Sequence, residues 1–244
     1  MTIISNCGKM TRMRMQNLIK QSRVKERREM KLYILRHGET DWNLKRLVQG
    51  VTDIPLNEYG RYLAKETAKG FQDISIDLVY TSPLKRAKET AQLVLEGKEY
   101  TMIEDSRIQE MGFGEYEGMC FGGADKAPES ADFNKFFVDT ENYKPTKGGE
   151  SVQDVLDRTG SFLNDLYQDP DIQEKNILIS THGAAMTALL NHIKNNLSIK
   201  DYWNDPVPPN CGVTIVEVKN GIPKILEKNL VYYKEPVRKW SVEE

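Results

Sequence analysis

The chain has 244 residues, with 34 Lys or Arg, 36 Asp or Glu, three His and a formal net charge of −2 at pH 7. This length fits one domain or at most two, and an apolar content of 39 % together with 17 glycines is that of a globular protein, which excludes a chain that is disordered throughout. Residues 1–29 hold eight basic and two acidic side chains, a net +6, so the other 215 residues carry −8 and have no general attraction for nucleic acid or anionic membranes.

The basic segment at residues 1–29 has no long apolar run, so no secretory signal peptide is visible. A transit peptide and a flexible arm that binds a partner remain open. The sequence favours a start assigned too early, because it holds several methionines and strand-like sequence follows Met30. We therefore expect a basic N-terminal extension at 1–29 and one folded domain at 30–244.

The three cysteines are odd in number, far apart and without metal-ligand spacing. They favour a reducing compartment and argue against a structural metal. No stretch approaches 18 apolar residues, so we expect no membrane span and a cytoplasmic location.

Apolar runs and helical periodicity alternate along the main part of the chain. Short apolar runs predict strands at residues 31–35, 78–81, 100–103 and 176–180. Helices are expected at 57–71, 85–95, 131–138, 151–167 and from 183 to about 193, with Asn57 and a Ser151–Asp154 capping box as start signals. Residues 213–218 and 222–226 flank Asn220-Gly221 and predict a terminal hairpin. This order predicts an α/β three-layer sandwich, in which helices flank a mostly parallel central sheet and the terminal hairpin lies at the sheet edge.

The strongest chemical signal follows the first expected strand, where the sequence reads R-H-G-E-T-D-W-N from Arg36 to Asn43. A neutral imidazole can attack phosphorus, and a guanidinium can hold two phosphoryl oxygens. A His beside an Arg is more often structural when it stands alone. Here His182 follows the strand expected at 176–180, so His37 and His182 should meet at the carboxyl edge of the sheet.

Together with its neighbours, this segment resembles the histidine phosphatase superfamily, in the branch of cofactor-dependent phosphoglycerate mutases and related phosphatases. The family signature R-H-G-x-T-x-x-N is met at 36–43. Further matches follow in the family's order: Q-G at 49–50, S-P-L-x-R-A-x-x-T-A at 82–91, E-x-x-F-G-x-x-E-G at 110–118, G-E-S at 149–151 and T-H-G at 181–183. The resemblance runs from about residue 31 to 218 and leaves out 1–29. It implies a phosphoglycerate mutase-like fold and a histidine phosphatase catalytic domain at 30–244.

The resemblance also implies a set of site residues. His37 would take the phosphoryl group, and Glu110 would protonate the leaving oxygen and later activate water. Glu115 and Glu117 lie on the same loop as rivals, and the spacing to Phe113-Gly114 selects Glu110. The implied set comprises five catalytic and three substrate-binding residues: His37, Glu110, Arg36, Arg86 and His182, and Asn43, Gln49 and Gly183.

The resemblance leaves the acceptor of the phosphoryl group open. If water accepts it, the enzyme is a phosphoric monoester hydrolase, and if a second substrate hydroxyl accepts it, the enzyme is a phosphoglycerate mutase. Family mutases carry a paired-arginine element between the positions that correspond to Glu110 and His182, and here Arg158 is the one arginine of that stretch. The stretch between Glu110 and His182 also holds aromatic residues that form either a lid over a modest pocket or the core of a helix: Phe133, Phe136, Phe137 and Tyr143. We therefore expect a hydrolase, with the mutase as the alternative and an inactive phospho-ligand-binding relative as a third class.

The resemblance and the composition together predict the partners. A small phosphorylated substrate is expected, with no cofactor and no metal, on a monomer or homodimer. Neither nucleic acid nor a membrane is expected to bind the catalytic domain.

Overall fold

The computed structural model describes residues 29–237 of the chain. The predicted extension at 1–29 lies outside these residues except for Glu29, which begins the first strand, β1. Its structure and the domain boundary therefore remain predictions.

Six strands form one sheet in the order β3-β2-β4-β1-β5-β6. The pairs β1–β4, β4–β2 and β2–β3 are parallel, and β5 is antiparallel to both β1 and β6. The sheet is thus mostly parallel, with the predicted terminal hairpin at one edge. The strands are β1 (Glu29–Arg36), β2 (Leu78–Thr81), β3 (Thr101–Glu104), β4 (Asn176–Thr181), β5 (Val213–Lys219) and β6 (Ile222–Leu230).

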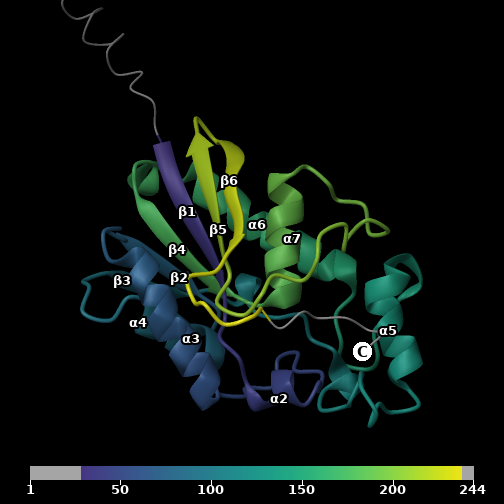
Figure 1. Ribbon diagram of the computed structural model, residues 1–244. Coiled ribbons are helices and arrows are strands. Elements are labelled where there is room, and N and C mark those ends of the chain that lie inside the picture. Colours follow the sequence, from purple (N-terminus) through teal and green to yellow (C-terminus); the bar gives the residue numbers. More distant parts are fainter. Residues whose placement is uncertain (1–28, 238–244) are drawn as a thin grey trace, which may run out of the picture.

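Helices α3 and α4 cover one face of the sheet, and α6 and α7 cover the other (Figure 1). Helix α5 stands apart from the sheet on the far side of α7 (Figure 1). The helices are α2 (Asp41–Leu44), α3 (Glu58–Ala68), α4 (Lys85–Val94), α5 (Ser130–Val138), α6 (Val152–Gln168) and α7 (Gly183–Ile193). Short 3₁₀ turns lie at Lys69–Phe71, Ser106–Ile108, Gly114–Tyr116, Thr140–Asn142 and Pro170–Ile172.

Local sequence signals explain where the long helices begin. The side chain of Asn57 accepts a hydrogen bond from the backbone N–H of Gly60, which satisfies one of the free donors at the start of α3. At the start of α6, Ser151 and Asp154 form the predicted capping box. The short helix α2 was not expected from periodicity, although Thr40 and Asn43 cap it in the same reciprocal way.

A cluster of aromatic side chains packs between α5 and the loop that precedes α5. Phe133 and Phe136 of α5 contact Phe113 edge-on, with ring centroids 5.2 and 5.3 Å apart. Tyr143 packs behind Phe136 at 5.2 Å. These contacts join α5 to the loop that contains Phe113.

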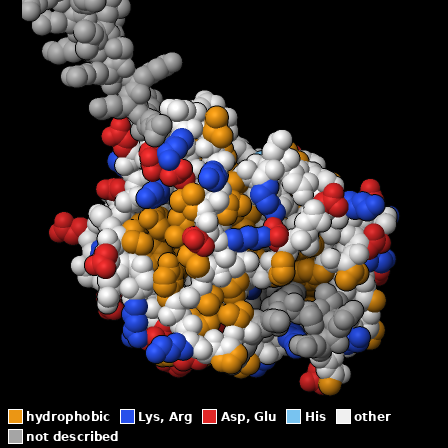
Figure 2. Space-filling model, turned by 45° about the horizontal axis from the view of Figure 1, so that its top comes forward, with side chains coloured by type: hydrophobic (Ala, Val, Ile, Leu, Met, Phe, Trp, Pro, Cys, Tyr) orange, Lys and Arg blue, Asp and Glu red, His pale blue; other side chains and the backbone are white. Residues whose placement is uncertain are grey.

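The face in Figure 2 carries acidic and basic side chains interspersed around an uncovered apolar area. Within residues 29–237, no helix combines the length and apolarity that a bilayer crossing requires.

Candidate active site

Two adjacent parallel strands bring two histidines together. Arg36, the last residue of β1, pairs with Thr181, the last residue of β4. His37 and His182 each follow their strand by one residue, and the N–H of His37 donates to the carbonyl of Thr181 at 2.9 Å. The two imidazole centroids lie 5.0 Å apart. The predicted meeting of the two histidines at the carboxyl edge is confirmed.

The backbone after His37 passes close to the start of α3. A Cβ atom on Gly38 would lie 2.7 Å from the carbonyl oxygen of Gly60, too near for any larger residue without a backbone shift. The N–H of Gly38 donates to Oγ1 of Thr90 on α4 at 2.9 Å. Glycine at 38 and threonine at 90 therefore fix the course of the loop that carries His37.

The His37 ring is held in one tautomer. Its Nδ1 lies 2.7 Å from the carbonyl oxygen of Gly38, and because a carbonyl can only accept, Nδ1 carries the proton. The lone pair is then on Nε2. Burial lowers the pKa of His37 well below 6.5, and the nearby Arg86 and Arg36 lower it further. The imidazole is therefore neutral at neutral pH, which is the nucleophilic form.

His182 is engaged on both ring nitrogens. Nε of Arg86 donates to Nδ1 of His182 at 3.2 Å, so Nε2 carries the proton and donates to Oγ of Ser82 at 2.7 Å. Burial and then Arg86 lower the pKa of His182 well below 6.5. The His182 ring bonds Arg86 and Ser82, and His182 is not among the residues that line the pocket. Its predicted role at a phosphoryl group therefore stays a prediction.

Acid is expected to destabilise the fold through these two rings. Both pKa values are depressed in the folded chain, whereas each ring binds a proton near pH 6.5 when unfolded. The unfolded state then binds more protons below pH 6.5. The stabilisation is complete above pH 6.5 and is lost as the pH falls toward the folded pKa values, by up to about 1.4 kcal/mol per pH unit for each ring.

Urea unfolding at pH 7.5 and 5.5 measures this loss. His37→Gln should remove roughly half of the pH dependence, because one of the two rings no longer titrates. Equal free energies of unfolding at the two pH values would contradict the burial of neutral rings.

Two arginines bring positive charge to the same place. The guanidinium of Arg86 donates to the carbonyls of Thr52 and Gly50 at 2.8 and 2.7 Å, and burial lowers its pKa to about 10, which keeps it charged at neutral pH. Arg36 donates through Nη1 to the carbonyl of Pro208 at 2.5 Å. Its Nε is buried and bonds no protein group within the described residues. That Nε lies near Gly183 at the wall of the pocket that His37 also lines.

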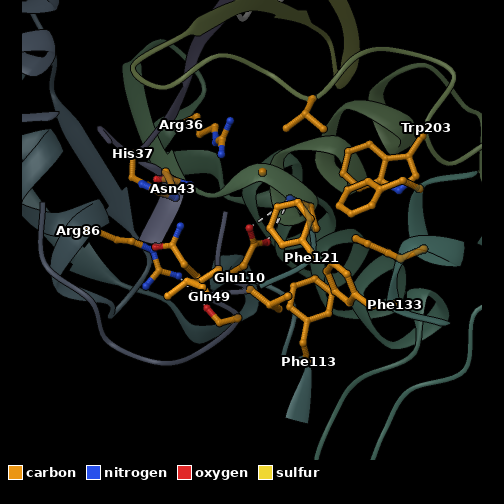
Figure 3. Close-up of a pocket in the computed structure, with 18 residues that line it drawn as sticks. Arg36, His37, Asn43, Gln49, Arg86, Glu110, Phe113, Phe121, Phe133 and Trp203 are labelled. Atoms are coloured by element: carbon orange, nitrogen blue, oxygen red, sulfur yellow. Dashed lines mark hydrogen bonds between the residues drawn. The ribbon is translucent and has the colours of Figure 1, made fainter. Parts of the chain in front are cut away.

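Glu110 lies at the N-terminus of α7. Its Oε1 accepts hydrogen bonds from the N–H groups of Ala184 and Ala185, both at 3.1 Å, and from that of Met111 at 3.0 Å. These free N–H groups at the start of a helix bond mainly Oε1, which leaves Oε2 able to carry a proton. These donors hold the carboxyl group at the pocket, between the two arginines and the aromatic cluster (Figure 3).

The rival glutamates lie elsewhere. The carboxylate of Glu117 accepts from the N–H groups of Val51, Thr52 and Phe113 at 3.0, 2.9 and 3.0 Å, so it joins two loops. Glu115 is exposed. Of the three, Glu110 lines the pocket, in line with its selection from the sequence.

The predicted substrate-binding residues also lie at the pocket wall. Asn43, on α2, accepts the N–H of Thr40 at 3.1 Å, and Thr40 Oγ1 donates to Gln49 Oε1 at 2.9 Å. Gly183 is the first residue of α7 and is buried next to Glu110. The structure thus brings Asn43, Gln49 and Gly183 to one wall.

The pocket has two unlike ends. Arg36, His37, Asn43 and Arg86 gather at one end, and aromatic rings line the other, with Glu110 between them (Figure 3). The sequence left open whether four aromatic residues cover the pocket or form helix core. Phe133, Phe136 and Phe137 do both, because they line the pocket and also pack in the aromatic cluster. The apolar lining consists of Leu47, Val48, Phe113, Phe121, Phe133, Phe136, Phe137, Ala184, Trp203 and Val207.

Several residues at the site carried no signal in the sequence. Trp203 and Val207 line the pocket from the irregular segment between α7 and β5, where neither periodicity nor a motif draws attention to them. Ser82 and Glu150 lie inside matched motifs, but the spacing of those motifs does not indicate that Ser82 bonds His182 or that Glu150 pairs with Arg158. Arg158 is the one arginine between Glu110 and His182, but its bonds to Glu150 and to the backbone of residues 107–110 depend on how α6 packs.

Among residues 29–237 no group of three or more His, Cys, Asp or Glu side chains could hold a metal ion.

Comparisons with known proteins agree with this geometry. Residues 32–231 match the family model of the histidine phosphatase superfamily (branch 1). The phosphatase PhoE of Bacillus subtilis is 38 % identical over 160 residues, which cover 66 % of this chain and 75 % of PhoE. A 2,3-bisphosphoglycerate-dependent phosphoglycerate mutase of Gloeobacter violaceus is 32 % identical over 168 residues, or 65 % of this chain and 73 % of that protein.

A solved structure shows the same fold. The phosphoserine phosphatase of Entamoeba histolytica, in complex with 3-phosphoglyceric acid, superposes with a TM-score of 0.68 at 29 % sequence identity. The match covers 83 % of this chain and 98 % of that one.

Proposed function

The chain belongs to the histidine phosphatase superfamily, and on that basis we propose that it is a metal-independent phosphomonoester hydrolase. It acts on a small phosphorylated metabolite through a phosphohistidine intermediate. The pocket joins a cationic end to an aromatic end, which suits a small molecule that carries one phosphate group.

In the first step, the lone pair on Nε2 of His37 forms a bond to phosphorus while the ester P–O bond breaks. The electron pair of that bond stays on the leaving oxygen, which takes a proton from the carboxyl group of Glu110. Arg36 and Arg86 carry the charge on the equatorial phosphoryl oxygens, where preorganised donors are worth most. The alcohol then leaves.

In the second step, water attacks the phosphohistidine. The carboxylate of Glu110 takes a proton from that water, and the electron pair of the N–P bond returns to Nε2. Inorganic phosphate leaves, and both groups regain their starting states.

One observation carries the proposal, namely the state of His37. The buried imidazole is neutral, its Nδ1–H donates to the carbonyl of Gly38, and it lines the same pocket as the guanidinium groups of Arg36 and Arg86. A structural histidine gains nothing from a neighbouring pair of arginines, because they disfavour its charged form. A nucleophile for a phosphate dianion requires that combination.

The pocket favours hydrolysis over the mutase reaction. Among the described residues that line it, the Lys and Arg side chains are Arg36 and Arg86, and both lie near His37 (Figure 3). The opposite wall is aromatic. A bisphosphoglycerate carries a second phosphate and a carboxylate, and an apolar wall would leave those charges without partners.

Phosphate release from phenyl phosphate in the presence of a chelator tests the proposal. We expect turnover that the chelator does not change. Incubation with 3-phosphoglycerate, with and without 2,3-bisphosphoglycerate, separates the alternatives: 2-phosphoglycerate formed faster than inorganic phosphate would identify a mutase. A folded chain that binds phosphate and releases none would identify an inactive relative.

Glu110→Gln is expected to slow the enzyme in proportion to how much the leaving oxygen needs a proton. With phenyl phosphate, kcat/KM should fall by about 10² to 10⁴-fold, the usual contribution of a general acid. With 2,4-dinitrophenyl phosphate, whose leaving group departs as an anion, the fall should be small. An equal loss with both substrates would argue against proton donation by Glu110.

The proposal includes a cytosolic location for a monomer or homodimer. The free thiols of Cys120 and Cys211 support a reducing compartment.

A further inference from the structure

Arg158, on α6, uses all of its hydrogen-bond donors within the protein. Nε and Nη2 donate to the two carboxylate oxygens of Glu150 at 2.7 and 3.0 Å. Nη1 donates to the carbonyls of Arg107 and Gln109 at 2.8 and 2.9 Å, and Nη2 also donates to the carbonyl of Glu110 at 3.1 Å. A guanidinium has five N–H donors, and the five bonds account for all of them.

Glu150 bonds the other end of the segment of residues 107–112, at Gly112. Its Oε2 accepts the N–H of Gly112 at 2.8 Å, and its own N–H donates to the carbonyl of Gly112 at 2.8 Å. The ion pair is largely buried, with side-chain exposures of 15 % for Arg158 and 25 % for Glu150. The backbone on both sides of Glu110 is therefore bonded to one ion pair.

The two ends of Glu110 are thus fixed by different helices. Its backbone carbonyl is bonded to Arg158 of α6, and its carboxylate accepts the first N–H groups of α7. A carboxyl group must lie within about 3 Å of the oxygen that it protonates, and a misplacement of about 1 Å can cost about 10²-fold in rate.

We propose that Arg158 and Glu150 are positioning residues that set the reach of the Glu110 carboxyl group toward the leaving oxygen. The inference rests on the proposed function and deepens it. Neither residue lines the pocket, so each acts through the backbone of residues 107–112 rather than by touching the substrate.

Arg107 provides a matched control on the same segment. Its guanidinium also pairs with carboxylates, Asp105 at 2.7 Å and Asp165 of α6 at 2.6 Å. Its side chain bonds no backbone group of residues 109–112, in contrast to that of Arg158. Replacing Arg107 with lysine keeps the charge and changes the hydrogen bonds and packing of the region without releasing Glu110.

The test compares Arg158→Lys with Arg107→Lys on two substrates. A lysine keeps the charge but has three donors on one nitrogen, so it cannot span Glu150 and three carbonyls. We expect kcat/KM of Arg158→Lys to fall by about 10 to 10²-fold with phenyl phosphate and by less than about twofold with 2,4-dinitrophenyl phosphate. Arg107→Lys should leave both values unchanged. Glu150→Gln keeps an acceptor for the N–H of Gly112, so its kcat/KM should also fall more with phenyl phosphate than with 2,4-dinitrophenyl phosphate, but by a smaller factor. This variant replaces Arg158→Lys in the test if Arg158→Lys does not fold.

A double variant removes the remaining ambiguity. If Arg158 acts through Glu110, Arg158→Lys should cause no further loss with phenyl phosphate once Glu110→Gln is present. Losses that multiply, or an equal loss with both substrates, would overturn the inference and leave the proposed function intact. A wild-type chain that releases no phosphate from either substrate would overturn both.

Discussion

Replacing His37 with alanine is expected to abolish turnover, with a loss of at least about 10⁴-fold in kcat, because no other group can take its part as the nucleophile. The geometry leaves the Nε2 lone pair of this buried, neutral ring available beside Arg36 and Arg86. Acid quench during turnover of a ³²P-labelled substrate should trap acid-labile phosphate on the wild-type chain and none on the variant. If the alanine variant does not fold, His37→Gln repeats the measurement.

His192→Ala is the matched control. This histidine lies in the last turn of α7, where its ring bonds the carbonyl of Leu156 at 2.7 Å and packs against Gly160 on α6. Its loss should lower stability and leave the activity per folded molecule near that of the wild type. Near-full activity or trapped phosphate in His37→Ala would refute the mechanism.

Arg36→Lys is expected to lower kcat/KM by about 10² to 10³-fold and to weaken inhibition by inorganic phosphate. A buried N–H without an acceptor costs about 1 to 3 kcal/mol, and the Nε of Arg36 has no acceptor among residues 29–237. A phosphoryl oxygen beside His37 would satisfy it. Lysine supplies the charge as a point and loses the planar fork that holds two oxygens.

Steady-state kinetics and phosphate inhibition measure both effects, with Arg61→Lys as control. Arg61 pairs with Glu89 and Glu58 on the α3–α4 side of the sheet, outside the pocket, and its replacement should change neither value. If Arg36→Lys kept wild-type kcat/KM, the free Nε would need another explanation.

The elements that the sequence predicted well are those whose signals are local. The buried run of β4 and the capping box of α6 depend on neighbouring residues alone, and both elements begin where they were expected. Helix α2 was missed because four residues are too short to show a period. The last strand runs to Leu230, beyond the expected end at 226, because pairing with β5 continues past a register irregularity that sequence does not announce.

The same division holds at the site. Motifs located His37, Arg36 and Glu110, because each lies at a fixed distance from a strand end or a glycine. They did not reveal that His182 bonds Arg86 and Ser82, because this contact depends on the parallel pairing of β2 with β4. The bonds of Arg158 to residues 107–110 likewise depend on how α6 packs, which no spacing along the chain encodes.

The position of β4 governs when during synthesis this site can exist. Strand β4 lies between β1 and β2, yet it is made about 100 residues after β2 leaves the ribosome. Until residues 176–181 emerge, β1 and β2 have no shared neighbour, and the bond between His37 and Thr181 cannot form. Such long-range closure is slow to nucleate. A nascent chain therefore carries its nucleophile for most of translation without a pocket around it, and catalytic competence arises only after β4 and the segment with Trp203, Val207 and Pro208 have been made.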